Sequence, residues 1–297
     1  MKILVTTDAG SLGAKIVLKL AQTTAHDIVS ISTEHGHQET IDYSAYNVIQ
    51  HQCDLSDLLG LIQLTAGVDL IIHAAEFRSS VKTDKHRLFE INQQGTAHIV
   101  DCCLANGVGQ LLYISHVSAL GADRGRPLHE DDIWMDKPIK SLYGQSKYLG
   151  EQETWRGQAE GLSVNIIAHS TIVSTSLRDL GSAKELTTGV VSEHDIVDMV
   201  KAMIDRGLDG EKYICSAHSI THAQLHDALF SQSDGSKSTM SIAAFWRRRL
   251  PFLFGQPMTN DGAYLLQPHR NIDYDNHKSI NQLGFTYRSV EETLDIR

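Results

Sequence analysis

The sequence predicts an α/β fold in which helices cover both faces of a doubly wound parallel sheet. Short apolar runs recur along the chain, and the segments between them are long enough to hold a helix. The first run is followed by a glycine-bearing turn and an amphipathic helix. Strands of a parallel sheet are buried on both faces, so continuously apolar runs are expected in them.

The first strand, turn and helix are the part of the chain around which the rest is organised. Residues 2–6 form an apolar run, and Leu12, Ile16 and Leu20 recur at helical spacing. Such a turn directs backbone N–H groups and a helix N-terminus at a phosphate. Gly10 lets the backbone approach a pyrophosphate, and Gly13 lets the helix pack closely on the strand. The residues predicted to bind a dinucleotide here are Thr7, Gly10, Ser11, Leu12 and Gly13.

The turn also has a plainer interpretation as an ordinary β-α turn with two space-saving glycines. A dinucleotide-binding turn normally begins with a glycine, and Thr7 holds that position. Threonine is β-branched and poorly suited to positive φ, so either the backbone takes an ordinary φ here or the site is degraded.

The second strand is predicted at residues 27–32, and its end is where such folds recognise the ribose. An acid there favours a free 2′-hydroxyl, whereas a basic group accommodates a 2′-phosphate. This strand ends in Ser32 and Thr33, with Glu34 beyond it and Lys15 as a nearby candidate cation. The pattern slightly favours NADP over NAD.

Two further strands, at residues 47–51 and 69–73, end in candidate cofactor contacts. Asp54, followed by Leu55, can accept a hydrogen bond from an adenine amino group or cap the next helix. Ala74 and Ala75 leave room for a flat ligand, but they also suit plain packing.

The remaining elements continue the alternation and suggest two lobes. Residues 1–171, with 192–217 returning to them, are predicted to form a dinucleotide-binding domain, and residues 172–191 and 218–297 a smaller, mostly helical substrate lobe. The aromatic and basic segment 243–254, with Arg247–Arg249, favours a helix of that lobe over a membrane-surface or partner patch. Helices are expected at 92–106, 143–158, 193–205 and 223–230, and strands at 110–115, 163–168 and 212–215.

Composition excludes several classes of protein. The 297 residues carry a formal net charge of -10, which argues against nucleic-acid binding. No apolar run reaches the ~18 residues of a membrane span, and Met1 leads straight into a core strand rather than a secretory signal. The four cysteines lack metal or redox spacing, so we expect no metal site and a reducing, cytoplasmic location.

Tyr143 and Lys147 are the candidate catalytic pair. They are four residues apart in a helical stretch, so their side chains share a face. A nearby ammonium is expected to lower the pKa of the Tyr143 phenol from its ordinary value of ~10. Tyr143 could then exchange a proton with a carbonyl or alcohol while hydride moves to or from a nicotinamide, and Lys147 could hold the ribose. The alternative is a helix-surface pair with no role.

In their order along the chain, these residues resemble the extended short-chain dehydrogenase/reductase family. That family includes sugar-nucleotide epimerases and dehydratases and dihydroflavonol-reductase-like enzymes, and it has the Rossmann fold. The resemblance extends from Met1 to about Leu294. Its elements are Gly10 with Gly13, Asp54, Ala74-Ala75, Asn92 with Gly95-Thr96, Tyr113-Ile114-Ser115, Tyr143 with Lys147, Asp195 before a helix, and Lys278 with Leu283-Gly284-Phe285.

The resemblance implies roles for individual residues. Tyr143 corresponds to the acid/base, Lys147 to its electrostatic and ribose-binding partner, and Asn92 to an asparagine that supports the active site. The family places a Ser or Thr hydroxyl on the substrate carbonyl where this chain has His116, which could donate from a ring nitrogen, with Ser115 or Ser118 as substitutes.

The sequence therefore predicts an NAD(P)-dependent oxidoreductase, epimerase or dehydratase. Its substrate would be a sugar nucleotide or similar small polar molecule with a hydroxyl or ketone, and the family suggests a homodimer. Thr7 and His116 support an alternative, a catalytically impaired dinucleotide-binding sensor or scaffold of the same fold.

Overall fold

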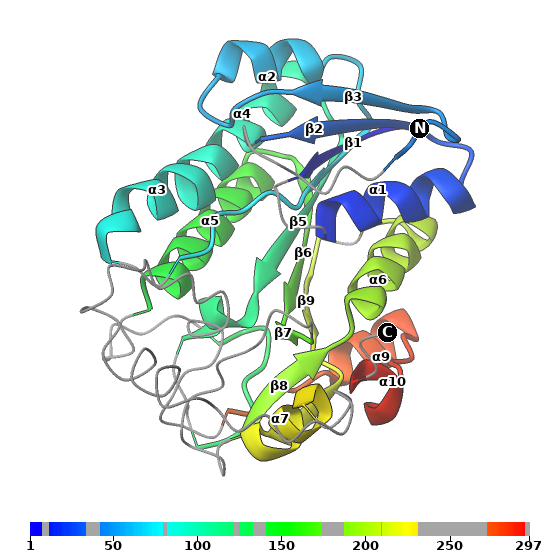
Figure 1. Ribbon diagram of the computed structural model, residues 1–297. Coiled ribbons are helices and arrows are strands. Elements are labelled where there is room, and N and C mark those ends of the chain that lie inside the picture. The colour runs from blue at the N-terminus through cyan, green and yellow to red at the C-terminus, as the bar shows by residue number, and fades with distance from the viewer. Residues whose placement is uncertain are drawn as a thin grey trace, which may run out of the picture.

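A seven-stranded parallel sheet forms the centre of the molecule (Figure 1). The computed structural model describes residues 1–7, 12–33, 42–79, 82–121, 125–132, 141–173, 187–208, 210–230 and 272–294. The strands of this sheet are β1 (Lys2–Thr7), β2 (Asp27–Ser32), β3 (Val48–Gln52), β4 (Leu70–His73), β5 (Gln110–His116), β6 (Ser163–His169) and β9 (Lys212–Cys215). All seven lie within one residue of the apolar runs that predict them.

The strand order is β3-β2-β1-β4-β5-β6-β9, and every neighbouring pair is parallel. The chain leaves β1 in one direction to build β2 and β3 and returns to its other side to build β4. In an open α/β sheet, ligands bind outside the carboxyl ends of the strands where the order reverses. Here that point lies between β1 and β4, and the predicted doubly wound fold is confirmed.

Helices cover both faces of the sheet (Figure 1). On one face α1 and α6 pack against an apolar cluster that includes Ile3, Val5 and Ile72. On the other, α2, α4 and α5 pack over a second cluster that includes Leu4, Ile71 and Leu111. These helices are α1 (Leu12–Thr23), α2 (Leu58–Leu64), α4 (Thr96–Asn106), α5 (Leu142–Ala159) and α6 (Glu193–Arg206).

Helix α1 lies directly against β1 because Gly13 has no side chain. A Cβ at Gly13 would lie 2.9 Å from Thr7 Cγ2 and 3.1 Å from Thr7 Cα, closer than ordinary van der Waals contact. The packing role that the sequence predicts for Gly13 is therefore present. Thr7 itself ends β1 in an extended strand conformation, so no positive φ is demanded of it.

Helix α4 is preceded by an irregular stretch that the sequence did not predict. Residues 90–95 form a π-helix, η2 (Glu90–Gly95), and a regular helix begins only at Thr96. π-Helical turns frequently occur at functional sites, and this one contains Asn92. The other short elements near the carboxyl ends of the strands are η1 (Lys82–Asp84), α3 (Lys85–Phe89) and η3 (Val117–Leu120).

A small second sheet, in the order β10-β8-β7, extends beyond the main one. Two of its strands, at residues 187–191 and 218–221, fall in segments that the sequence assigned to a mostly helical lobe, and the third, at residues 171–172, spans the predicted boundary. The predicted division into two lobes stays a prediction, and the basic segment with Arg247–Arg249 lies outside the described residues. The elements of this region are β7 (Thr171–Ile172), β8 (Thr187–Val191), β10 (His218–Thr221), α7 (His222–Phe230), α9 (His277–Leu283) and α10 (Val290–Leu294).

Two ion pairs connect the C-terminal segment to α6. Arg288 donates from Nη1 to Asp195 Oδ1 at 2.5 Å and from Nη2 to Asp198 Oδ2 at 2.8 Å. Asp195 is fully buried, so this bridge compensates a carboxylate that is removed from water. Among the described helices, none combines the length and apolar character that a membrane span requires.

Candidate active site at the carboxyl ends of β4 and β5

The predicted dinucleotide turn is described at its two ends. Thr7 closes β1, its hydroxyl donates to the carbonyl of Ile31 at 3.3 Å, and its own carbonyl accepts from the N–H of Thr33 at 3.0 Å. Helix α1 begins at Leu12, with Gly13 buried against the strand. Gly10 and Ser11 lie outside the described residues. The end of β1 and the start of α1 thus lie at the point where the strand order reverses.

Among the described residues near the end of β2, two candidate groups for a 2′-phosphate are engaged by other residues. The Thr33 hydroxyl donates to the carbonyl of Thr7 at 3.1 Å. Lys15, the candidate cation, forms an ion pair with Glu193 at the start of α6. Glu34 lies outside the described residues. Ser32 remains at the strand end as predicted.

Asp54 and Leu55 follow β3 and have different environments. Asp54 is exposed, and its Oδ1 accepts from the N–H of Ser56 at 2.8 Å, which closes a local turn. Leu55 is buried in the core, and its carbonyl lies 2.6 Å from Nδ1 of His98. Of these two residues, only Asp54 exposes its side chain at this edge of the sheet.

Ala74 and Ala75 hold the chain close to β1 as it leaves β4. The N–H groups of both donate to Oγ1 of Thr6, each at 3.2 Å. The same hydroxyl lies 2.7 Å from Nδ1 of the buried His73. Burial lowers the pKa of His73 to about 3, so this ring is neutral and acts as a structural hydrogen-bonding group.

Tyr143 and Lys147 lie on the first two turns of α5, which Ser141 caps by accepting from the N–H of Gly144 at 3.0 Å. Both side chains are fully buried. Nζ of Lys147 donates to the carbonyl of Ile114 at 2.9 Å and lies 4.6 Å from the centre of the Tyr113 ring. The predicted shared helix face is therefore turned into the protein, toward the end of β5.

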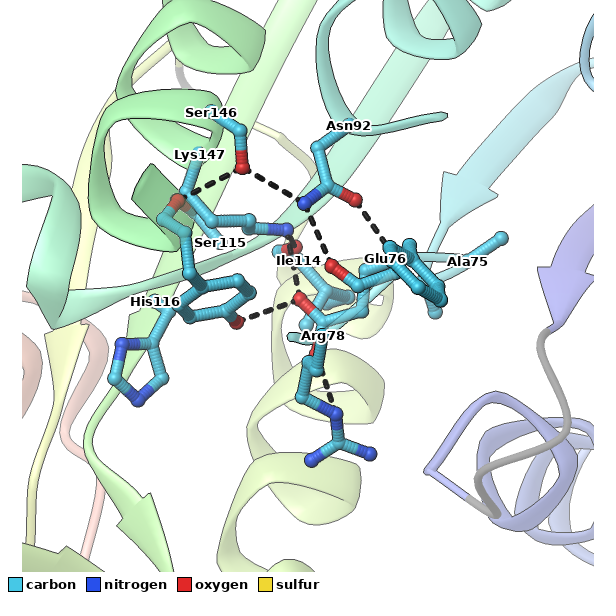
Figure 2. Close-up of polar contacts among 12 residues, drawn as sticks. Ala75, Glu76, Arg78, Asn92, Ile114, Ser115, His116, Ser146 and Lys147 are labelled. Carbon is cyan, nitrogen blue, oxygen red and sulfur yellow. Dashed lines mark hydrogen bonds and ion pairs between the residues drawn. The ribbon is translucent and has the colours of Figure 1, made fainter. Parts of the chain in front are cut away.

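Glu76, which the sequence analysis missed, contacts both of these side chains, and Figure 2 shows it beside Lys147. Its Oε2 accepts from Oη of Tyr143 at 2.8 Å and lies 3.1 Å from Nζ of Lys147. Its Oε1 lies 3.4 Å from Nε of Arg78. An available signal was its place directly after Ala74-Ala75, where a charged residue follows a buried strand at the ligand-binding edge.

The carboxylate of Glu76 reverses the expected effect of Lys147 on Tyr143. Burial, followed by the negative charge of Glu76, raises the pKa of Tyr143 well above its ordinary value, so the predicted lowering is wrong. Burial opposes ionisation of Glu76 too, but Lys147 and Arg78 outweigh it and hold the pKa of that carboxyl below its usual range. At neutral pH the group consists of a phenol, a carboxylate and two cations.

Asn92 fixes the segment that carries Glu76. Its Oδ1 accepts from the N–H of Phe77 at 2.7 Å, and its Nδ2 donates to the carbonyl of Phe77 at 2.8 Å and to Oγ of Ser146 at 2.9 Å. The hydroxyl of Ser146 donates in turn to the carbonyl of Tyr143 at 2.8 Å. One buried amide thereby connects η2, α5 and the segment after β4 (Figure 2).

His116 and Ser115 take different directions at the end of β5, since successive residues of a strand face opposite sides. The Ser115 hydroxyl donates to Oε1 of Glu151 at 2.6 Å, and Glu151 pairs with Lys212 at 2.6 Å. The ring of His116 instead lies 5.4 Å from the ring of Tyr143, centre to centre. The structure thus brings His116, but not the Ser115 hydroxyl, beside Tyr143.

The tautomer of His116 follows from its neighbours. Its Nδ1 accepts from the N–H of Ser118 at 3.0 Å, so this nitrogen carries no proton in the neutral ring. Burial, helped by His169, lowers the pKa of His116 well below its ordinary value, so the ring is neutral and its proton is on Nε2. Within the described part of the chain this buried Nε2 has no hydrogen-bond partner. It is a donor that an oxygen atom of a ligand could use.

Solved structures of similar fold include a UDP-glucose 4-epimerase and a dTDP-glucose 4,6-dehydratase. The UDP-glucose 4-epimerase of Thermotoga maritima, solved with UDP-glucose, superposes with a TM-score of 0.75 at 19% identity, covering 100% of this chain and 97% of that one. The dTDP-glucose 4,6-dehydratase of Streptomyces venezuelae, solved with NAD, gives 0.74 at 18% identity, covering 99% and 96%. Similarity at these identities concerns the fold alone.

The chain belongs to the 3-beta hydroxysteroid dehydrogenase/isomerase family, whose model matches residues 4–181, and thus to the extended short-chain dehydrogenases/reductases. It is 31% identical over 156 residues to the 3 beta-hydroxysteroid dehydrogenase/Delta 5-->4-isomerase of monkeypox virus, covering 50% of this chain and 44% of that protein. It is 24% identical over 242 residues to sterol demethylase protein B of Methylococcus capsulatus, covering 76% and 72%. The chain thus spans about half the length of the poxviral relative.

Proposed function

We propose that this protein is an NAD(P)-dependent oxidoreductase that interconverts a hydroxyl and a ketone of a small polar molecule. Tyr143 is the acid/base, and Lys147 is its electrostatic partner. The observation that carries the proposal is that Oη of Tyr143 and Nζ of Lys147 converge on one oxygen atom, Glu76 Oε2, at 2.8 and 3.1 Å. A ligand oxygen that lies beside this carboxylate could accept from the same two donors.

The described residues around the switch point fit a dinucleotide. Helix α1 begins at Leu12, five residues after the end of β1, and Gly13 permits its close approach. The small side chains of Ala74 and Ala75 follow β4. When bound, NAD(P) supplies or takes up the hydride. The residues proposed to hold it are Thr7, Gly10, Ser11, Leu12, Gly13, Ser32, Thr33, Asp54, Leu55, Ala74, Ala75, Tyr143 and Lys147.

Two proton donors face the proposed position of the substrate oxygen. Tyr143 is protonated at neutral pH and can donate to a carbonyl oxygen, which is general acid catalysis. The Nε2–H of His116 can donate to the same oxygen, as the hydroxyl does in the family that the sequence resembles. Asn92 holds these groups in position through its hydrogen bonds to Phe77 and Ser146. Ser115 has a structural role in this proposal, because its hydroxyl donates a hydrogen bond to Glu151.

A polar substrate is supported by the charges near Tyr143. Glu76 contacts Tyr143 and also pairs with Arg78 and Lys147. The imidazole of His116 lies beside Tyr143, and that of His169 lies beside His116. Desolvating so many charged and polar groups against a wholly apolar ligand would be costly. A sugar nucleotide or similar molecule is therefore proposed in preference to a steroid, although the family name refers to steroids.

For the cofactor, the ion pair of Lys15 leads us to expect tighter binding of NADH than of NADPH. Lys15 is engaged by Glu193, and the Thr33 hydroxyl by Thr7. We expect the Kd for NADPH to exceed that for NADH about tenfold, which is about 1.4 kcal/mol. Fluorescence titration measures both constants. The Glu193→Gln variant removes the partner of Lys15 and should lower the ratio of the Kd for NADPH to the Kd for NADH. The control variant Glu153→Gln removes a carboxylate that pairs with Arg156 and should leave this ratio unchanged. Tighter binding of NADPH by the wild-type protein would support the preference inferred from sequence.

Turnover with a substrate panel tests the proposed activity. The panel contains UDP-glucose, dTDP-glucose, a 3β-hydroxysteroid, a dihydroflavonol and a 2-alkyl-3-oxoalkanoate, which represent the substrates named for the relatives and structural neighbours. A change in the amount of reduced dinucleotide reports a dehydrogenase or reductase. An epimerase or dehydratase reoxidises the cofactor within one turnover, so its products are followed by mass spectrometry.

A second candidate is a dinucleotide-binding sensor or scaffold. It is favoured by the carboxylate of Glu76, which engages the very donors that catalysis requires. Dinucleotide binding without any turnover that depends on Tyr143 would support it. A homodimer is also proposed on family grounds, and light scattering of the purified protein tests it.

A further inference from the structure

The environment of Glu76 fixes where the proton of the Tyr143 hydroxyl lies. An ionised carboxylate can only accept hydrogen bonds, so Tyr143 must be the donor across the 2.8 Å contact. The ionised form of Glu76 is favoured by Nζ of Lys147 at 3.1 Å and by Nε of Arg78 at 3.4 Å. The phenol therefore keeps its proton as long as this carboxylate remains beside it.

The carboxylate is held in place from both sides of Glu76. On one side, the N–H of Ala75 donates to Thr6. On the other, both backbone groups of Phe77 bond to the Asn92 amide, and the guanidinium of Arg87 lies 4.4 Å from the centre of the Phe77 ring. Because the two flanking residues are fixed, the position of Glu76 belongs to the scaffold rather than to a freely moving surface side chain.

We infer that Glu76 is a positioning residue that keeps Tyr143 in its proton-donating form and offsets the charge of Lys147. This inference rests on the proposed function for its consequence, which is a site set for ketone reduction at neutral pH. In that direction the carbonyl carbon receives a hydride from the reduced dinucleotide, the carbonyl oxygen takes the proton of Tyr143, and the phenolate regains a proton from solvent. Alcohol oxidation needs the phenolate at the start, so Glu76 confines it to alkaline pH.

Besides burial, Glu76 is the charged group near Tyr143 that favours the protonated phenol. The groups that act on it are Glu76 and Arg78 from the segment after β4 and Tyr113 and His116 from β5. Lys147 from α5 contacts the same carboxylate as Tyr143, and the ring of His169 from β6 lies 5.1 Å from that of His116. His116 is neutral, and burial lowers the pKa of His169 to about 4, so neither ring is charged at neutral pH. Without Glu76, the remaining full charges would be the cations Lys147 and Arg78, which favour phenolate.

The experiment is a pH titration of the cofactor-free protein labelled with ¹³C at the ζ-carbon of tyrosine. Comparison with a Tyr143→Phe sample assigns the Tyr143 resonance. In the wild-type protein we expect no ionisation of Tyr143 below its ordinary pKa of ~10. In Glu76→Gln we expect the midpoint to fall by at least about one pH unit, a tenfold change in the dissociation constant. Glu153→Gln, which removes a carboxylate from another part of α5, should leave the midpoint unchanged.

Two results would overturn the inference. One is a wild-type Tyr143 that titrates at or below the ordinary value, and the other is an unchanged midpoint in folded Glu76→Gln. Circular dichroism at each pH confirms that the protein is folded. If Glu76→Gln does not fold, the same NMR titration is carried out on the Glu76→Asp variant. Its carboxylate is one methylene further from Tyr143, so a smaller fall is expected, and no fall would contradict the inference.

Kinetics separate this inference from the proposed function. If the protein turns over a substrate, the pH at which the kcat/KM of alcohol oxidation rises should move down in Glu76→Gln together with the NMR midpoint. Turnover that depends on Tyr143, with no shift of either midpoint, rejects the role of Glu76 and leaves the enzyme assignment intact. A shifted NMR midpoint in a protein that binds no dinucleotide rejects the enzyme assignment and leaves the role of Glu76 intact.

Discussion

Replacing Tyr143 with phenylalanine is expected to lower kcat by about 10²–10⁴-fold, the range for loss of a general acid/base. The ring, its packing beside His116 and the helix remain, so only the hydroxyl that donates to Glu76 is removed. The Kd for the dinucleotide should change by no more than about threefold, because the proposed phosphate-binding turn is distant in sequence and unaltered. Steady-state kinetics on the best substrate of the panel and a fluorescence titration measure the two quantities.

A matched control for this variant is Tyr46→Phe. Tyr46 is a partly exposed tyrosine whose hydroxyl accepts from Gln22 at 3.0 Å, away from the proposed site. Its kcat should stay close to that of the wild-type protein. If Tyr143→Phe also retained the wild-type kcat, Tyr143 would not be the acid/base, and the proposed chemistry would have to be abandoned.

Replacing Gly150 with alanine is expected to destabilise the protein by about 2–3 kcal/mol, the cost of overpacking a tight contact. At an ordinary helix position the same change stabilises by about 1 kcal/mol, so the sign of the effect is diagnostic. A Cβ at Gly150 would lie 2.5 Å from the carbonyl oxygen of Asn92 and 2.6 Å from Oη of Tyr113. Urea unfolding measures the change in the free energy of unfolding.

Gly60→Ala is the control for this second variant. Gly60 is also helical, but its close contact is with the carboxylate of Asp57, the far end of a side chain that can turn aside. Its effect should be smaller than about 1 kcal/mol, since a helix cap is at most weakened. Equal stability of Gly150→Ala and the wild-type protein would contradict the close approach of α5 to η2 on which the position of Asn92 depends.

The sequence predicts the sheet well because its signal is local. Buried parallel strands are continuously apolar, as in 2–6 and 110–115, and the structure places strands there within one residue. The pairing of Tyr143 with Lys147 is also local, because residues four apart share a helix face. The sequence analysis kept Ser115 as a substitute for His116, although side chains alternate between the two faces along a strand and the Ser115 hydroxyl donates to Glu151 instead.

The charge on Tyr143 could not be predicted in this way. Its partner Glu76 lies 67 residues earlier in the chain. The two meet only because Asn92, on an unpredicted π-helix, ties the segment after β4 to α5. Local sequence suggested that the nearest charge, Lys147, would lower the pKa of Tyr143, whereas burial and a distant carboxylate reverse that direction. The short strands of the second sheet were missed for a simpler reason, since runs of two to five residues carry little periodic signal.

Calorimetric titration of the purified protein with NADH tests the central claim most directly, because every proposed role of Tyr143 and Lys147 requires a dinucleotide beside them. We predict one binding site per chain with a Kd on the order of 1–100 μM, or about −8 to −5.5 kcal/mol, and a melting temperature that rises with NADH concentration. Neither heat of binding nor a shift in melting temperature at millimolar NADH and NADPH would contradict the account.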